Sequence, residues 1–197
     1  MPASGDPGAA VGPLRGLPTC EHYGVGELNY DAVGGTRPAD ARWSVHPSGY
    51  RSFEETVCVG RGVERWEAVA AAVLRWRVKI LSGFRVSPAG GDSAVRSANE
   101  YQLTVRVGPV RIREPVRVIA VVDQPTRRGF SYGTLVGHPV SGEEAFIASR
   151  SSDGKVWLTI RSLTRPASGG WRWAFPLLLV AQRFYRRRYL RSLTRMS

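Results

Sequence analysis

One segment of the chain, residues 130–146, combines strand-like residues with closely spaced ionisable side chains; it reads FSYGTLVGHPVSGEEAF. His138 precedes Glu143 and Glu144 by five and six residues, and a proline and a glycine restrict the backbone between them. A carboxylate that orients an imidazole near neutral pH is typical of a general acid–base pair. The alternative is structural: His138 caps the turn through backbone hydrogen bonds, and a glutamate pairs with an arginine. The spacing leaves both interpretations open.

Further polar side chains belong to the same candidate site. Alternate residues of a strand face one side, so Tyr132 and Thr134 are expected to line an interior. Asn-Tyr-Asp at 29–31 is predicted to lie at its mouth, although an Asx-type turn explains this tripeptide equally well. The predicted ligand-binding residues are Tyr30, Asp31, Tyr132, Thr134, His138, Glu143 and Glu144. If the site is catalytic, His138 shuttles a proton, Glu144 is its partner and Tyr132 stabilises an oxyanion.

A metal centre is not predicted by these spacings. No HxH or HExxH pattern exists, and a third ligand would have to come from Asp31, His22 or His46. We therefore expect neither a metal nor a cofactor. The two cysteines, Cys20 and Cys58, are expected to be reduced thiols in a cytoplasmic protein, because no secretory signature accompanies them.

The length and composition are those of a globular protein. A chain of 197 residues with 43% hydrophobic residues can bury a sizeable core without disulfides or a structural metal. Residues 1–20, rich in Pro, Gly and Ala, are predicted to be a disordered leader, and residues 21–197 a single domain. The sequence does not indicate an oligomeric state.

The formal net charge of +12 raises the question of nucleic-acid or anionic-membrane binding. Most of the basic residues are arginines spread along the chain, and no zinc-finger, basic-zipper or helix-turn-helix pattern accompanies them. Nucleic-acid binding is therefore not expected. One arginine cluster near the C-terminus is a candidate for weak contact with acidic lipid headgroups, with a solvated helix face as the alternative. Its members are Arg183, Arg186, Arg187 and Arg188.

The pattern of apolar residues predicts two helices and a set of short strands. Trp66, Val69, Ala70, Val73 and Ile80 follow helical spacing and predict one helix from Val63 to about Ile80. A second helix is predicted from about Trp171 to Leu193, with an apolar first half too short to span a bilayer. The predicted strands are Phe53–Val59, Phe84–Val86, Ala94–Ala98, Tyr101–Val107, Val110–Arg113, Val116–Asp123, Gly129–Leu135, Ala145–Ser149 and Val156–Leu163.

Short gaps between consecutive strands favour an antiparallel meander. The predicted fold is therefore α+β: a curved antiparallel sheet of about six to seven strands gripped by a long C-terminal helix. This order of elements resembles the helix-grip arrangement of START and Bet v 1-like proteins. Such a helix and sheet often enclose a pocket for an apolar ligand.

Several motifs resemble the uncharacterised DUF1990 (UPF0548) family. The segment 130–146 is similar to a family pattern, F-x-Y-G-T-L-x-G-H-P-x-x-G-E-E-x-F, and meets each of its fixed positions. Residues 28–36, 59–62, 117–123 and 162–166 also resemble parts of that family. The resemblance covers roughly residues 27 to 195. It departs at Val136 and Val140, where the family has Pro and Glu, and it implies no particular activity.

These observations together lead to three hypotheses. The first is a small cytoplasmic protein that binds a lipophilic molecule between the sheet and the C-terminal helix. The second is an enzyme of cyclase, dehydratase or isomerase type that acts in that pocket on a polyketide- or terpenoid-like substrate. The third is a peripheral binder of anionic membranes or nucleic acid through the arginine-rich helix. The sequence leaves open whether any reaction is catalysed.

Overall fold

The computed structural model describes residues 26–44, 46–88, 94–167 and 171–194. Within them, seven strands form one antiparallel sheet in the order β1-β7-β6-β5-β4-β3-β2. The strands are β1 (Arg51–Arg61), β2 (Arg85–Pro88), β3 (Glu100–Val107), β4 (Val110–Gln124), β5 (Arg127–Thr134), β6 (Val140–Arg150) and β7 (Lys155–Pro166). The helices are α1 (Val63–Val73), α2 (Arg77–Leu81) and α3 (Trp171–Ser192). The predicted leader, residues 1–20, lies outside the described residues.

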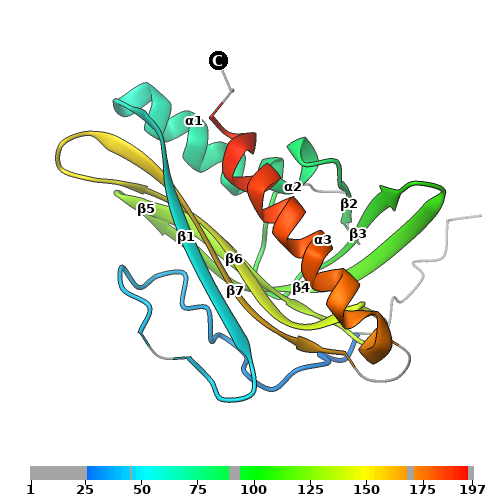
Figure 1. The fold of residues 1–197 in the computed structure, drawn as a ribbon. Helices are drawn as coiled ribbons and strands as arrows, with labels where there is room; N and C mark the ends of the chain where they lie inside the picture. The colour runs from blue at the N-terminus through cyan, green and yellow to red at the C-terminus, as the bar shows by residue number, and fades with distance from the viewer. Residues whose placement is uncertain (1–25, 45, 89–93, 168–170, 195–197) are drawn as a thin grey trace, which may run out of the picture.

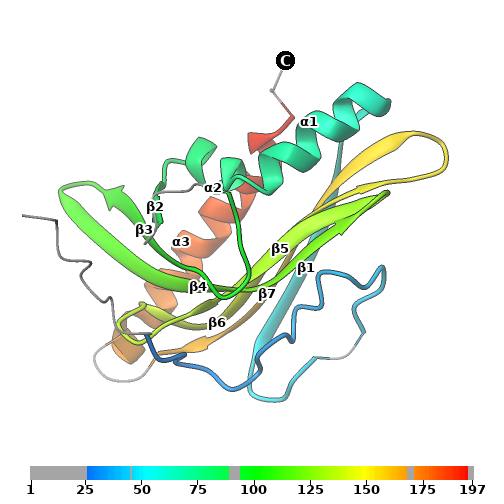
Figure 2. The ribbon, with the colours of Figure 1, turned by 180° about the vertical axis from the view of Figure 1, so that it is seen from behind.

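The curved sheet separates two layers (Figure 1). The three helices lie on its concave face, where α1 packs on β5 and β6, and α3 crosses β6 and β7. The segment 26–50 follows the convex face, as the view from behind also shows (Figure 2). The predicted curved antiparallel sheet with a long C-terminal helix is confirmed.

Apolar side chains on the concave face form the core. In α1, Trp66, Val69 and Val73 are fully buried, as their helical spacing predicts. They join a cluster with Phe130 of β5 and Phe146 of β6, two strands that pair directly. Burial of such side chains is the main favourable contribution to folding.

The predicted continuous helix from Val63 to Ile80 is wrong in one respect: it breaks at Trp76. Trp76 adopts a left-handed conformation with φ 58°, and the amide of Val95 donates to the carbonyl of Leu74 at 3.0 Å. The turn directs the Trp76 indole into the core, 4.6 Å from the Phe130 ring centroid. Beyond the break α2 has a new orientation, so Lys79 is buried and Ile80 is 36% exposed.

Three of the predicted strands also differ. Residues 94–98 form no strand. The two strands predicted at 110–113 and 116–123 are one continuous strand, β4, although Glu114-Pro115 interrupts the apolar pattern. Pairing of β4 with β5 begins only at Val116, so Pro115 lies outside that ladder, where a missing amide hydrogen is tolerated.

The turn in segment 130–146 is shorter than expected, because β6 begins at Val140. Glu143 and Glu144 therefore lie within the strand, opposite Gly133 and Tyr132 of β5. Since neighbouring strand residues face opposite sides, the two carboxylates lie on opposite faces of the sheet.

Polar contacts attach the segment 26–50 to the convex face. Glu143 accepts hydrogen bonds from the Tyr30 hydroxyl at 2.9 Å and from the Gly34 amide at 2.7 Å. The buried guanidinium of Arg161 donates to Glu54 at 2.8 Å and to the carbonyl of Arg37 at 2.6 Å. Tyr30 and Trp43 are buried, which confirms that this glycine-rich segment packs onto the sheet.

Gly142 is required by the close approach of β6 to β7. Its φ is 150°, and a Cβ atom there would lie 1.9 Å from the carbonyl oxygen of Leu163.

We expect Gly142→Ala to lower the free energy of unfolding by about 3 kcal/mol or more, measured by urea denaturation. Gly108→Ala is the control, because Gly108 has φ 59° but no atom within 4 Å, and it should cost only about 1 kcal/mol. Equal losses would contradict the steric explanation.

Candidate functional site

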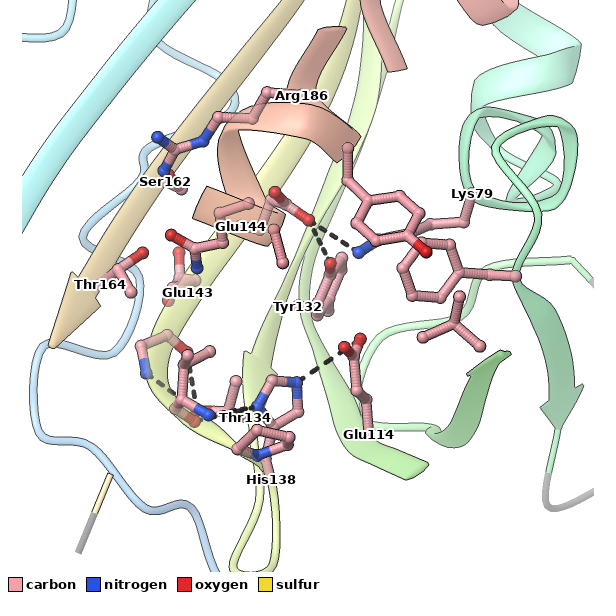
Figure 3. A pocket seen from close by; sticks show the side chains of 18 of the residues that line it. Lys79, Glu114, Tyr132, Thr134, His138, Glu143, Glu144, Ser162, Thr164 and Arg186 are labelled. Atoms are coloured by element: carbon pink, nitrogen blue, oxygen red, sulfur yellow. Dashed lines mark hydrogen bonds and ion pairs between the residues drawn. The ribbon is translucent and has the colours of Figure 1, made fainter. Parts of the chain in front are cut away.

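A cavity of about 100 Å³ lies between the concave face of the sheet and α3 (Figure 3). Much of its wall is apolar, and the polar side chains come from α2, β4, β5, β6, β7, α3 and the turn before β6. The residues that line it include Lys79, Glu114, Tyr132, Thr134, His138, Glu144, Ala181, Tyr185, Arg186 and Tyr189. An apolar pocket with a few convergent polar groups is the usual form of a small-molecule site.

The polar centre of the cavity is a buried ion pair. The ammonium of Lys79 lies 3.0 Å from Glu144 Oε2 and donates to the hydroxyl of Tyr189 at 2.8 Å. The Tyr132 hydroxyl donates to the same Glu144 oxygen. Lys79 is only 3% exposed, so the attraction acts with little screening by water. These four side chains come from α2, β5, β6 and α3, and their contacts connect the sheet to the two helices. Figure 3 shows Lys79, Tyr132 and Glu144 directed toward one another.

Aromatic rings surround the Lys79 ammonium. Its Nζ atom lies 4.5 Å from the ring centroid of Phe84, 4.7 Å from Tyr189, 5.2 Å from Tyr132 and 5.9 Å from Phe146. A cation within about 6 Å of an aromatic face is attracted by the ring quadrupole. The rings therefore replace part of the hydration that Lys79 loses on burial.

The two phenols beside the ion pair are neutral. Burial, reinforced by the negative charge of Glu144, raises the pKa of Tyr132 well above its ordinary value of 10.0. The same causes raise the pKa of Tyr189. Both hydroxyls therefore keep their protons at physiological pH and can act as hydrogen-bond donors.

His138 lies at the end of the cavity near β4. Its Nδ1 atom lies 2.9 Å from the carbonyl oxygen of Val140 and 3.1 Å from the amide nitrogen of the same residue, and Nε2 lies 3.8 Å from Glu114 Oε2. Burial and then the charge of Lys79 lower the pKa of His138 to about 3. Burial also raises the pKa of Glu114, partly offset by Lys79. His138 is therefore a neutral imidazole, not one half of a charged pair.

The structure brings four of the predicted residues together: Tyr132, Thr134, His138 and Glu144 all line the cavity. The carboxylate facing His138 is that of Glu114, whereas Glu144 contacts Lys79 and Tyr132. The hydroxyl of Thr134 already has hydrogen-bond partners: it donates to the side-chain oxygen of Asn29 and the carbonyl of Gly142, and it accepts from the Gly142 amide.

The other predicted residues direct their polar groups to the convex face. Both carboxylate oxygens of Glu143 accept hydrogen bonds from the segment 26–50. Glu143 therefore borders the cavity, but its carboxylate is directed to that segment and not to a ligand in the cavity. Tyr30 donates to Glu143. Asp31 is bonded to Tyr50 at 2.5 Å and to Arg165 at 3.1 Å. Neither Tyr30 nor Asp31 lines the cavity.

Sequence reasoning missed Lys79, Glu114 and Tyr189. Lys79 lies near the end of the single helix predicted from Val63 to about Ile80, and a continuous helix there does not reveal its burial. Glu114 fell in an assumed gap between two strands. Tyr189 belongs to the basic part of α3, but its ring faces the core at 3% exposure.

The arginine cluster of α3 divides between two environments. Arg183, Arg187 and Arg188 are exposed. Arg186 instead faces the sheet, donates to Ser162 Oγ at 2.7 Å and lies over the Phe53 ring at 3.9 Å. The outward side of α3 also carries apolar side chains, with Leu177 74%, Val180 68% and Phe184 56% exposed.

No helix in the described part of the chain is both long and apolar enough to cross a membrane. Among the same residues, no three His, Cys, Asp or Glu side chains gather as a metal-binding group would.

Removing one partner of the buried ion pair should destabilise the protein strongly. We expect Lys79→Met to lower the free energy of unfolding by about 3–5 kcal/mol, because Glu144 would stay buried without its counter-charge. The double variant Lys79→Met/Glu144→Gln should recover much of this loss in urea denaturation. A double variant as unstable as the sum of both single variants would show that the two charges do not interact.

The pKa of His138 predicts a dependence of stability on pH. Between pH 6.5 and about 3 the unfolded chain binds a proton that folded His138 does not, so stability falls as the pH falls through 6.5. Glu114 acts in the opposite sense: its raised pKa means that stability is lost as the pH rises above 4.5.

We expect His138→Gln to lose less stability than the wild type between about pH 8 and about pH 5. Glu114→Gln should gain stability relative to the wild type as the pH rises over that range. Urea midpoints at several pH values measure both. Parallel pH profiles for the wild type and His138→Gln would show that this imidazole is not held neutral.

Comparison with solved structures identifies the fold. The ZhuI aromatase/cyclase of a Streptomyces strain superimposes with a TM-score of 0.55 at 18% identity, covering 74% of this chain and 92% of that one. A hypothetical protein from Helicobacter pylori matches with a TM-score of 0.56 at 8% identity, covering 74% and 85%. At these identities the likeness shows the fold alone, which is the helix-grip fold.

Sequence comparison identifies the family. A "UPF0548 protein" of Deinococcus radiodurans is 35% identical, covering 81% of this chain and 86% of its own. A UPF0548 protein of Arabidopsis thaliana is 26% identical, covering 73% of this chain and 71% of its own. Residues 29–192 match the model of the DUF1990 family, a domain of unknown function. The chain therefore belongs to the DUF1990 (UPF0548) family.

Proposed function

We propose that this protein binds a small lipophilic molecule in the cavity between the sheet and α3. The observation that supports this most directly is an apolar cavity with the Lys79–Glu144 ion pair at its wall. An apolar body would pack on the rings of Tyr185 and Tyr189, and a polar group would bind near Lys79. The neutral phenol of Tyr132 would help to orient that group.

The size of the cavity limits the ligand. At about 100 Å³ it is smaller than the engineered protein cavity of about 150 Å³ that admits benzene. A ligand enclosed by the observed cavity is therefore no larger than about one ring or a short alkyl chain. A larger ligand would have to extend outside it or displace α3.

An enzyme in the same pocket is the second candidate, and Glu144 is the observation that favours it. Its carboxylate, a potential proton acceptor, contacts the donors Tyr132 and Lys79 at the cavity wall. A cyclase, dehydratase or isomerase would use such a group on a polyketide- or terpenoid-like substrate. Since that substrate exceeds the cavity, this function also requires the substrate to extend outside the cavity or α3 to move. Conversion of a bound compound by the wild type but not by Glu144→Gln would distinguish catalysis from binding.

Filling the cavity should abolish binding. Native mass spectrometry of the purified protein should show a co-purifying lipophile, and isothermal titration calorimetry should show that octanol binds. Ala181 lines the cavity from α3, so Ala181→Phe should weaken octanol binding by about tenfold or more by occupying the space. Arg188→Phe places the same ring on the exposed side of α3 and should leave binding unchanged. An empty wild-type protein that binds no octanol would refute the proposal.

A further inference from the structure

A second depression adjoins the cavity at Arg186. It is an open groove of about 630 Å³ between α3 and the first half of β1. Its lining residues are Arg51, Ser52, Phe53, Glu55, Thr164, Leu179, Val180, Gln182, Arg183, Arg186 and Arg187. Three of them, Thr164, Gln182 and Arg186, also line the cavity. The two spaces therefore meet at these three residues.

The groove is strongly basic. Four guanidinium groups line it against the single carboxylate of Glu55. Arg51, Arg183 and Arg187 are exposed. Within the described residues, no ion pair joins Arg183 or Arg187 to a carboxylate. Such a concentration of one sign of charge attracts anions.

Two of the shared residues carry a buried polar atom for which the described part of the chain offers no hydrogen-bond partner. Arg186 Nε and Gln182 Oε1 are buried and have no hydrogen-bond partner within the described part of the chain. The rest of the Arg186 guanidinium is held in place by Ser162 and Phe53. A buried donor without an acceptor is costly. An anionic group placed against Arg186 from the groove would supply that acceptor.

We propose that the groove binds the anionic end of a soluble amphiphile whose apolar end enters the cavity. This inference rests on the proposed function and adds the ligand class: an apolar chain or ring that carries a carboxylate or a phosphate. The dimensions agree with it, because the small cavity accepts a short apolar end and the larger groove accepts the headgroup. Leu179 and Val180 provide apolar surface along the groove. The arginines favour oxyanions, which guanidinium groups bind through paired hydrogen bonds.

Octanoate and octanol test this proposal, because they differ in charge at one end. By isothermal titration calorimetry at low salt, the wild type should bind octanoate at least about threefold more tightly than octanol. The double variant Arg183→Gln/Arg187→Gln should lose this preference and keep its affinity for octanol. Arg188→Gln is the control: it removes one guanidinium from α3 at a position outside the groove and should keep the preference for octanoate over octanol.

Three results would overturn the inference in distinguishable ways. Equal affinity of the wild type for octanoate and octanol would refute the anionic ligand class and leave the proposed cavity binding intact. A preference that survives in both Arg183→Gln/Arg187→Gln and Arg186→Gln would exclude the groove. If neither compound binds, the proposed function fails as well.

Vesicles distinguish a soluble amphiphile from a headgroup presented by a bilayer. Phosphatidylcholine vesicles with and without phosphatidylserine are the probe, and co-sedimentation is the measurement. The protein could co-sediment only with vesicles that contain phosphatidylserine, only when the groove arginines are present, and show no preference for octanoate. That result would overturn the soluble ligand in favour of a membrane surface. A preference for octanoate without vesicle retention is the expected result.

Discussion

The organisation of the molecule depends on the alternation of side chains along β6. Glu143 and Glu144 are neighbours in sequence, but the pleat sends one carboxylate to each face of the sheet. Glu143 holds the irregular segment 26–50 on the convex face, and Glu144 holds Lys79 on the concave face. The two carboxylates would repel each other if both lay in one turn. On opposite faces of the sheet, each has its own hydrogen-bond or ion-pair partners. A shift of register by one residue would exchange them and break both sets of contacts.

Lys79 has the same central position on the helical side. It contacts Glu144 from the sheet and Tyr189 from α3, while its own helix, α2, follows directly after the break at Trp76. The ion pair is therefore the meeting point of the sheet and two helices. Removal of a buried charge from water is unfavourable, and here the ring faces and the neutral Tyr189 hydroxyl offset part of that cost. The polar side chains at the cavity wall thereby have fixed positions.

The sequence predicted the layers of this fold better than its polar contacts. Helical spacing predicted α1 and α3, and short gaps predicted the meander, because these features depend on neighbouring residues. The break at Trp76 depends on contacts with Val95 and Phe130, distant in sequence, so spacing alone could not reveal that Lys79 is buried. Likewise, Pro115 resembles the end of a strand in the sequence. A strand tolerates a proline only where no neighbouring strand needs its amide hydrogen, and that depends on where β5 begins to pair with β4.

The candidate site shows the same division. Tyr132, Thr134, His138 and Glu144 line the cavity because the motif that contains them is one hairpin. Which partner each side chain has is a long-range property. His138 faces Glu114 of β4, not a glutamate of its own motif. Asp31 bonds to Tyr50 and Arg165 on the convex face.

The two borders of the sheet also affect how copies of this chain can meet. β2 has four residues and ends at Pro88, while β1 carries exposed charged side chains and a register shift between Cys58 and Gly60. A short strand, a proline, charges and a bulge all oppose the addition of a strand from another molecule. Self-association by continuation of the sheet is therefore disfavoured at both borders. A concentrated solution of this protein would resist strand-mediated aggregation as long as the fold stays intact.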